Sequence, residues 1–344
     1  MQQRIDLDRA RKGLAIVILL GIFAIAVISL LTFNKDTISA LKNVRLIYIG
    51  LAVLSVFLSW LFSAIPFYIL TRAVKKPISL PKSFSIYLGG SFFGFVTPFG
   101  SGLVPAQIFI LTNDGLSPGQ ATAVTSSRAT ISSWLFVVLG LVIFLAFGSK
   151  LSGTARAGLL SIAAAAAVWS LIILFFIKKP GSAKSAVARI LERPVFLKLL
   201  GEVRLNNMRA RLNREIEHLS SNLKDLFSGA NLLAVIAVFV AEMIAWSAIF
   251  SVLPLVMLAF GLQSNFAQLL FRLFLLFSVA PASPTPGGTG LVETALAGLL
   301  NGLVVKSLLA PVIVIWRFLT YYLIILVGGL IVLRLIAKPS SAKQ

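Results

Sequence analysis

The amino-acid sequence predicts an all-α polytopic membrane protein with two inverted repeats, each containing a re-entrant helical hairpin broken by glycine and proline. Three observations support this fold class. First, 58% of the 344 residues are apolar, 12% are charged, and the mean hydropathy is +0.97, which is typical of a chain that crosses a bilayer several times. Second, a Gly/Pro-rich motif occurs twice. Third, the lysines and arginines are distributed unevenly among the predicted loops.

The repeated motif reads Thr-Pro-Phe-Gly-Ser-Gly-Leu-Val at 97–104 and Thr-Pro-Gly-Gly-Thr-Gly-Leu-Val at 285–292. Six of the eight positions are identical at a constant separation of 188 residues, and Pro66 and Pro254 share this separation. Within a bilayer, a broken helix is tolerated only where protein or a watery cavity satisfies the freed backbone groups. Matched breaks in two halves are typical of a transport site; the alternative is two unrelated loops that both favour proline and glycine.

The first half of the chain begins with a retained helix. Residues 14–33 form an apolar run behind four basic side chains, and this run is as long as a full span, whereas the apolar part of a secretory signal is shorter. A span at 46–70 leads into a basic cytoplasmic loop. Residues 83–112 contain two short apolar arms around the first motif. Because each arm rises only about 1.5 Å per residue, neither arm crosses a ~30 Å core, and a re-entrant hairpin is predicted. Spans at 119–147 and 157–177 follow.

The second half repeats this plan after a polar segment. Residues 178–230 carry eleven Lys/Arg and five Asp/Glu. Their apolar residues recur near helical spacing, so we expect one or two amphipathic helices on the cytoplasmic membrane surface; a solvated linker helix is the alternative. A span at 231–260, a hairpin at 265–304 around the second motif and a last span at 307–337 complete the chain.

These elements define five regions and one topology. The regions are an N-terminal helix and outer loop (1–45), a first membrane repeat plus an extra span (46–177), a cytoplasmic basic amphipathic segment (178–230), a second membrane repeat (231–337) and a cytoplasmic tail (338–344). The topology places 22 of the 31 Lys/Arg on the cytoplasmic side, as the positive-inside rule expects. The first hairpin then enters from the cytoplasm and the second from outside. We therefore expect a multi-pass protein of the cell (cytoplasmic or inner) membrane, with both termini in the cytoplasm.

Five ionisable residues fall within the predicted apolar segments: Arg128, Glu242, Arg272, Glu293 and Arg317. Each costs a few kcal/mol at the bilayer centre, so positions that face lipid without a partner are disfavoured. One interpretation is that they pair with one another and lock the bundle. Two acids cannot neutralise three arginines, however, and the surplus positive charge predicts an anionic ligand whose phosphate oxygens match the guanidinium fork. Glu293 and Glu242 are candidates for proton coupling.

Further groups near the two motifs are candidates for the same site. Backbone N–H groups at four glycines would approach an anion at the N-termini of the broken helices: Gly100, Gly102, Gly288 and Gly290. Polar side chains predicted to add hydrogen bonds to the headgroup are Thr97, Ser101, Gln107, Thr285 and Thr289.

No catalytic residue, metal site or cofactor is predicted. The chain has no cysteine and one histidine, His218, which lies in a charged segment. No Ser/His/Asp set, His/Glu metal spacing or Walker-type loop occurs, so we expect a transporter-like protein rather than an enzyme. The net charge of +20 is attributed to basic cytoplasmic loops beside anionic lipid, and no nucleic-acid partner is expected.

The two motifs resemble those of the flippase-like transmembrane domain of lysylphosphatidylglycerol synthases and their stand-alone relatives, the UPF0104 proteins. TPFGSGLVPAQ is similar to the first-half pattern T-P-F-x-S-G-G-E-P-x-Q, and PTPGGTGLVE to the second-half pattern P-T-P-G-G-x-G-x-x-E. Arg317 matches an arginine on the following helix. The resemblance covers about 46–337. The chain departs from the pattern at Leu103-Val104, where the family has Gly-Glu, and 178–230 is too short for the synthases' aminoacyl-transferase domain, so synthase activity is not implied.

The predicted function is therefore an integral membrane lipid translocase. It would bind or move an anionic lipid such as an aminoacyl-phosphatidylglycerol or a polyprenyl-phosphate carrier, with the headgroup between the two broken hairpins against Arg128, Arg272 and Arg317. Two alternatives remain: a proton- or ion-coupled transporter of a small anion, and a non-transporting accessory subunit of a lipid-modifying complex. The expected partner is the anionic membrane lipid, and a homo-oligomer or a lipid-synthesising partner enzyme is compatible with the sequence.

Overall fold

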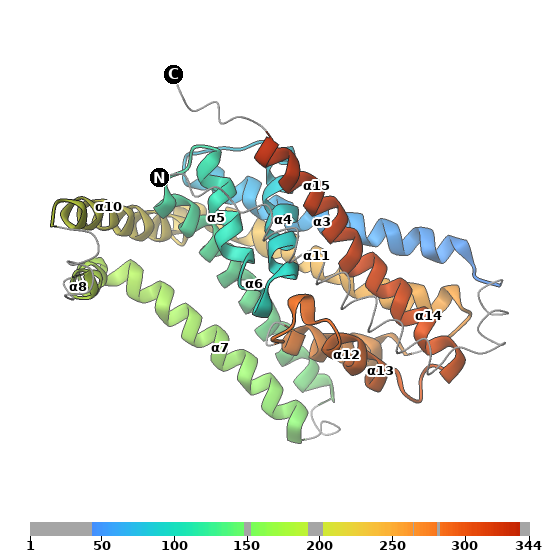
Figure 1. Ribbon diagram of the computed structural model, residues 1–344. Coiled ribbons are helices and arrows are strands. Elements are labelled where there is room, and N and C mark those ends of the chain that lie inside the picture. Colours follow the sequence, from blue (N-terminus) through green and yellow to red (C-terminus); the bar gives the residue numbers. More distant parts are fainter. Residues whose placement is uncertain (1–42, 148–152, 192–201, 264, 281–282, 338–344) are drawn as a thin grey trace. The chain divides into compact units, whose positions relative to one another are not determined.

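The computed structural model describes residues 43–147, 153–191, 202–263, 265–280 and 283–337 (Figure 1). Throughout these ranges the regular structure is helical, and no strand occurs among them, which confirms the predicted all-α class. The N-terminal helix predicted at 14–33 and the tail at 338–344 lie outside the described residues. The described residues divide into two compact units: the first comprises those within 43–63, 87–106 and 244–337, and the second those within 64–86 and 107–243.

Five helices among the described residues are long and apolar enough to cross a membrane. They correspond to the five spans predicted there from hydropathy. The helices and short turns, in chain order, are α3 (Leu46–Ala73), α4 (Leu80–Val96), η1 (Pro98–Gly100), α5 (Leu103–Asn113), α6 (Pro118–Phe147), α7 (Gly153–Lys178), α8 (Pro180–Leu191), α10 (Glu202–Leu226), η3 (Gly229–Asn231), α11 (Leu232–Ala259), α12 (Phe266–Val279), η5 (Pro286–Gly288), α13 (Leu291–Leu300), α14 (Lys306–Arg317), η6 (Phe318–Tyr322) and α15 (Leu323–Ala337).

Each long helix forms because an uninterrupted apolar run satisfies its backbone internally, which is the requirement for a segment in lipid. The two prolines that share the motif's separation, Pro66 and Pro254, both lie inside 28-residue helices, α3 and α11. The last span is α14, η6 and α15 in direct succession (Figure 1), and η6 is a π-helical segment of five residues. Such wide turns are frequent at functional sites.

In the second unit, α10 packs against α6, α7 and α8. Four of its apolar side chains, Leu205, Ile216, Leu223 and Leu226, are buried, whereas Leu212 is exposed, so most of the apolar face of this segment serves packing within the unit. The approach to α6 is close: a Cβ on Gly119 would lie 2.5 Å from the carbonyl oxygen of Glu215. The N–H of Gly119 also donates to Glu215 Oε2 at 2.8 Å. Glycine is therefore required where α6 begins.

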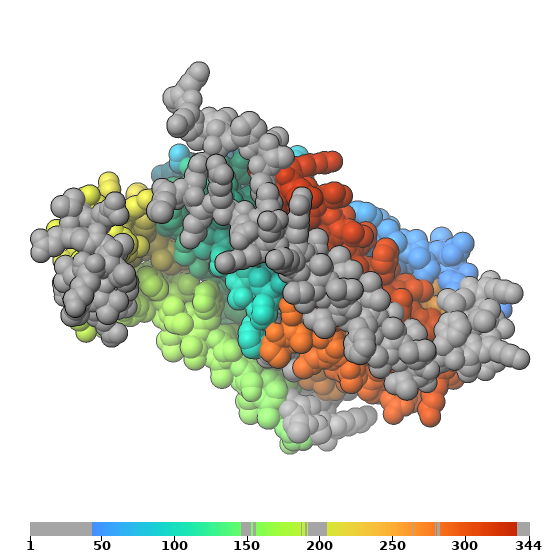
Figure 2. Space-filling view, viewed as in Figure 1, coloured from blue at the N-terminus to red at the C-terminus, as the bar shows by residue number. Residues whose placement is uncertain are grey.

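Helix α7 has few buried side chains. Leu160, Val168, Leu171 and Leu174 are exposed along it, and its side chains lie open on the face shown in Figure 2 (light green). A long apolar helix exposed in this way is typical of a span that faces lipid.

In the first unit, α15 packs closely on α4. A Cβ on Gly328 would lie 2.5 Å from the carbonyl oxygen of Leu88, and Phe92, Tyr321 and Ile325 form a buried cluster between the two helices. A second group of aromatic rings connects α11, α12 and α14 through Trp246, Phe250, Phe277 and Trp316. These contacts hold the ends of α14 and η6, which carry the arginine described below.

Candidate functional site

Both copies of the repeated motif interrupt helices, as predicted. The 3-10 turns η1 and η5 lie between α4 and α5 and between α12 and α13, and each turn begins with a proline that follows an extended threonine. The residue after the proline is left-handed in both copies, with φ 56° and ψ 17° at Phe99 and φ 60° and ψ 16° at Gly287. The two copies therefore share a backbone conformation at the start of the turn, up to Gly100 and Gly288, and they diverge at the next residue, where ψ is −23° at Ser101 and 134° at Thr289.

The two turns contact each other within the first unit. The N–H of Phe99 donates to the carbonyl oxygen of Ser283 at 3.1 Å, so one interruption satisfies a backbone group of the other. The arms beside the turns are short, with 17 and 11 residues in α4 and α5 and 14 and 10 in α12 and α13. At 1.5 Å per residue they measure roughly 15 to 26 Å, less than the ~30 Å core, which agrees with two hairpins that turn inside the membrane.

At the first break, the polar groups predicted to face a ligand hold the turn together. The N–H of Gly100 donates to the Thr97 carbonyl at 3.3 Å. The N–H of Gly102 donates to Thr97 Oγ1 at 2.8 Å, and the Thr97 hydroxyl donates to the carbonyl of Phe93 at 2.7 Å. Ser101 is exposed. A ligand at this turn would meet the Ser101 side chain directly, whereas both glycine N–H groups already have acceptors.

The second break is held in the same way. The N–H of Gly288 donates to the Thr285 carbonyl at 3.0 Å. The Thr285 hydroxyl donates to the carbonyl of Thr289 at 2.8 Å and lies 2.9 Å from Ser283 Oγ. The N–H of Gly290 donates to Glu293 Oε2 at 2.8 Å. A carboxylate of the chain itself therefore occupies the N-terminus of α13, where an external anion was expected.

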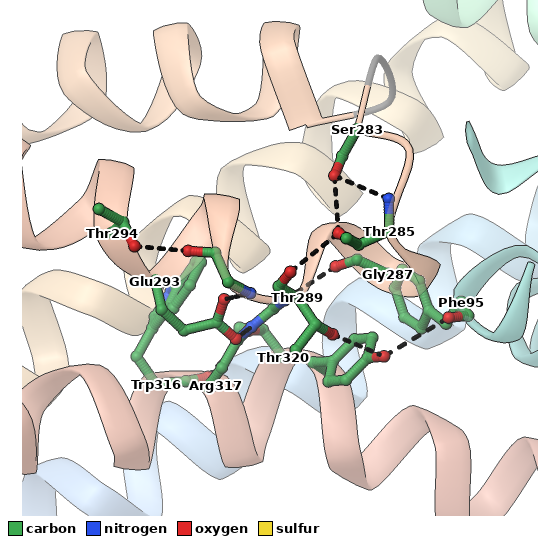
Figure 3. Close-up of polar contacts among 12 residues, drawn as sticks. Phe95, Ser283, Thr285, Gly287, Thr289, Glu293, Thr294, Trp316, Arg317 and Thr320 are labelled. Atoms are coloured by element: carbon green, nitrogen blue, oxygen red, sulfur yellow. Dashed lines mark hydrogen bonds and ion pairs between the residues drawn. The ribbon is translucent and has the colours of Figure 1, made fainter. Parts of the chain in front are cut away.

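Glu293 and Arg317 form a buried ion pair beside this break (Figure 3). Arg317 Nε donates to Glu293 Oε1 at 2.6 Å, and Arg317 Nη2 donates to the Gly287 carbonyl at 2.8 Å. The side chains are 0% and 5% exposed. The guanidinium also lies 4.2 Å from the centroid of the Tyr321 ring, a cation–π contact. One arginine thus connects α14 to the turn and to the first residues of α13.

Tyr321 and Gly287 complete this arrangement, and sequence reasoning missed both roles. Tyr321 belongs to the π-helical segment η6, and its ring fills the space beside Gly287: a Cβ there would lie 2.1 Å from Tyr321 Cε2. The Tyr321 hydroxyl donates to the Phe95 carbonyl at 3.4 Å and lies 3.5 Å from Thr289 Oγ1. The available signal was spacing, because a residue four positions after Arg317 lies on the same helical face.

Arg128 and Glu242 form a second membrane ion pair, in the second unit. Arg128 Nε lies 2.8 Å from Glu242 Oε1, and the carboxylate is buried. The guanidinium lies 5.2 Å from the centroid of the Phe67 ring. Gln107, another predicted ligand residue, belongs to the same unit; it is 2% exposed, and its Nε2 has no hydrogen-bond partner among the described residues.

Arg272 is the third arginine of the predicted set and lies on α12 in the first unit, half-buried. Nη1 of Arg272 donates to the carbonyl of Leu299, near the end of α13. Within the described part of the chain, no carboxylate pairs with it. The predicted surplus of one positive charge therefore falls on Arg272, because Glu242 and Glu293 each pair with another arginine.

Comparison with known proteins agrees with this architecture. A family model described as "Lysylphosphatidylglycerol synthase TM region" matches residues 13–328. The chain belongs to this family. It is also similar to a UPF0104 membrane protein of Archaeoglobus fulgidus, with 23% identity over 329 residues that cover 95% of this chain and 98% of that protein. The resemblance stated from the motifs is therefore confirmed, and the family match covers both broken hairpins and all five membrane arginines and glutamates.

Proposed function

We propose that this member of the family binds a lipid with an anionic headgroup inside the membrane and moves it between the two leaflets. Three features support the proposal. The family's description names a synthase of a phospholipid, lysylphosphatidylglycerol. The turns that break the two hairpins contact each other within one unit, and paired breaks are typical of transport sites. One membrane arginine has no carboxylate partner among the described residues. An aminoacyl-phosphatidylglycerol or a polyprenyl-phosphate carrier would supply the phosphate.

The unmatched charge of Arg272 is the observation that carries the proposal. A guanidinium has five N–H donors, and among the described residues Arg272 forms one hydrogen bond, from Nη1 to the Leu299 carbonyl. That carbonyl belongs to the C-terminal turn of α13, whose helix dipole offsets only about half an elementary charge. An uncompensated charge in a low-dielectric site costs several kcal/mol. A phosphate would neutralise Arg272 and occupy its free donors bidentately.

Arg317 and Arg128 enter the proposed function differently, because each already has a carboxylate. Protonation of Glu293 would change the net charge of its pair with Arg317 from zero to +1. The guanidinium of Arg317 would then be available to bind the anionic lipid headgroup. Protonation of Glu242 would do the same for Arg128. We therefore propose that proton uptake at either glutamate is coupled to lipid binding. In each pair, the glutamate and the lipid headgroup would compete for the same arginine.

Lipid binding by Arg272 variants tests the proposal. Purified protein is stripped of lipid, incubated with phosphatidylglycerol and analysed by native mass spectrometry. We expect Arg272→Ala to lose the bound lipid and Arg272→Lys to keep part of it, because lysine retains the charge without the planar fork. Arg334→Ala is the matched control, since Arg334 is exposed near the end of α15. Equal lipid binding by Arg272→Ala and the wild type would overturn the assignment.

One observation favours a second candidate, a non-transporting accessory subunit: four of the five membrane charges pair with each other, as expected for a locked bundle. If the protein is an accessory subunit, lipid should move between the leaflets of proteoliposomes at the rate seen in protein-free vesicles, both for the wild type and for Arg272 variants. A transporter of a small anion would instead bind inorganic phosphate as strongly as phosphatidylglycerol. The same preparation of protein therefore separates the three functions.

A further inference from the structure

Phe99 has a backbone conformation that its side chain disfavours. Its φ is 56°, in the left-handed region where a Cβ approaches the following carbonyl and where bulky residues are rare. Lys75 is the other described non-glycine residue with positive φ, but it lies two residues after the end of helix α3, where such a conformation commonly terminates a helix. Strained residues of this kind persist where the surrounding structure requires them, and they concentrate at functional sites.

The second copy of the motif shows what the turn itself requires. Gly287 occupies the position equivalent to Phe99 with nearly the same φ and ψ, so glycine satisfies this turn without strain. The space beside Gly287 is filled from within the chain by the ring of Tyr321. In the first copy the residue itself carries an aromatic ring, and Phe99 is 59% exposed. Burial within the described protein therefore does not account for a phenylalanine at this position.

The surroundings of Phe99 are mixed in polarity. Val104, in the first turn of α5, and Leu291, the first residue of α13, are both exposed and apolar. Ser101, which stands between Phe99 and Val104 in the sequence, is also exposed, and its side chain is polar. The exposed hydroxyl of Ser101 favours a polar neighbour, whereas the exposed side chain of Phe99 favours an apolar one. An amphipathic molecule meets both requirements.

We infer that Phe99 contacts the hydrocarbon chain of the translocated lipid, and that this contact is the reason for a phenylalanine in a left-handed position. The inference rests on the proposed function and adds a residue that recognises the apolar part of the lipid. The second break is closed by Tyr321, and the first break presents its aromatic ring to the ligand. Arg272 recognises the phosphate and Phe99 the chain.

Paired substitutions at Phe99 and Phe109 separate this role from a structural one. Phe109 is a matched control because it is 46% exposed on α5, eleven residues long and regular. We expect Phe99→Gly to melt at a higher temperature than Phe99→Ala, since glycine relieves the strain. At Phe109 we expect the glycine variant to melt at a lower temperature than the alanine variant, because glycine weakens a helix. We also expect both Phe99 variants to bind dioleoyl-phosphatidylglycerol about tenfold more weakly than the wild type, and both Phe109 variants to bind it normally.

A headgroup fragment without chains, glycerophosphoglycerol, provides the final comparison. Its affinity should be the same for the wild type and the Phe99 variants, because the fragment lacks the part that Phe99 contacts. Unchanged binding of the full lipid by Phe99→Ala and Phe99→Gly overturns the inference while leaving the proposed function intact, and so does an equal loss in the Phe109 variants. A wild type that binds no lipid overturns the proposed function and this inference together.

Discussion

Glu293→Gln removes one charge from the buried pair with Arg317 and changes few other contacts. The amide oxygen of glutamine can still accept from the Gly290 N–H, which the carboxylate accepts at 2.8 Å. The guanidinium of Arg317, 5% exposed, would keep the Gly287 carbonyl as its partner and lose its counter-charge. Arg317→Met is the complementary change: it keeps an apolar stem of similar length and leaves the Glu293 carboxylate buried without a cation.

Breaking a buried ion pair by removing one partner costs about 3–5 kcal/mol, because an uncompensated charge remains. Coulomb's law at an effective dielectric of about 20 and a charge separation of about 4 Å gives a similar figure, about 4 kcal/mol. Replacing both partners removes both charges, and such replacements are often close to neutral. We therefore expect the double variant Glu293→Gln/Arg317→Met to lose no more stability than either single variant.

The assay is reversible unfolding in detergent, followed by loss of helical circular dichroism, on the wild type, the two single variants and the double variant. Arg334→Met, at an exposed position near the end of α15, serves as the control and should change stability by less than about 0.5 kcal/mol. If the two single losses instead add within about 0.5 kcal/mol in the double variant, the pair is not energetically coupled, and the reasoning about a buried charge is refuted.

Three further predictions concern close contacts and topology. Gly287→Ala should destabilise the protein strongly, because the new Cβ would lie 2.1 Å from the Tyr321 ring at a φ of 60°, and thermal unfolding measures the loss. Gly119→Ala should loosen α10 from α6, because its Cβ would lie 2.5 Å from a backbone carbonyl of α10, and faster hydrogen exchange in α10 reports this. Single cysteines at Lys76 and Gln263 should react with a membrane-impermeant maleimide from opposite sides, in a chain with no native cysteine.

Each of these predictions has a control and a contradicting result. Gly298→Ala and Gly181→Ala introduce a methyl group where nothing lies within 4 Å, so both should leave stability and exchange near wild-type values. Wild-type melting of Gly287→Ala would contradict the packing of Tyr321 against the turn, and unchanged exchange in the Gly119 variant would contradict a tight contact between α6 and α10. Labelling of both cysteines from one side would contradict the inverted arrangement of the hairpins.

Most of the fold was predictable from the sequence because lipid imposes strict requirements on a chain. A span must be long, apolar and helical, so hydropathy located the helices that became α3, α6, α7, α11 and the last span. Glycine and proline located the two interruptions at 97–104 and 285–292 for the same reason. The cap at Gly290 also had a sequence signal, since Glu293 stands three residues later, as in a capping box.

The candidate site was predictable only in part, because a count of the charged residues in a sequence does not show which of them form ion pairs. The surplus positive charge was expected, but its assignment to Arg272 depends on which arginines reach Glu242 and Glu293 in three dimensions. Arg317 was one of the three arginines predicted from the sequence to hold the headgroup, and its role there stays a prediction that now requires displacement of Glu293. The π-helical turn that presents Tyr321 has no sequence signal that we recognise, and the exposure of Phe99 depends on tertiary packing.

Lipid movement in proteoliposomes tests the central claim most directly. Phosphatidylglycerol that carries a fluorescent label on one acyl chain, close to the headgroup, is distributed over both leaflets. Dithionite added outside the vesicles then bleaches only the labelled lipid that reaches the outer leaflet. We predict that the wild type bleaches inner-leaflet phosphatidylglycerol faster than protein-free vesicles do, and that Arg272→Ala reduces the rate to the protein-free value while Arg334→Ala does not. Bleaching by the wild type at the protein-free rate, or at a rate that Arg272→Ala leaves unchanged, would contradict the account.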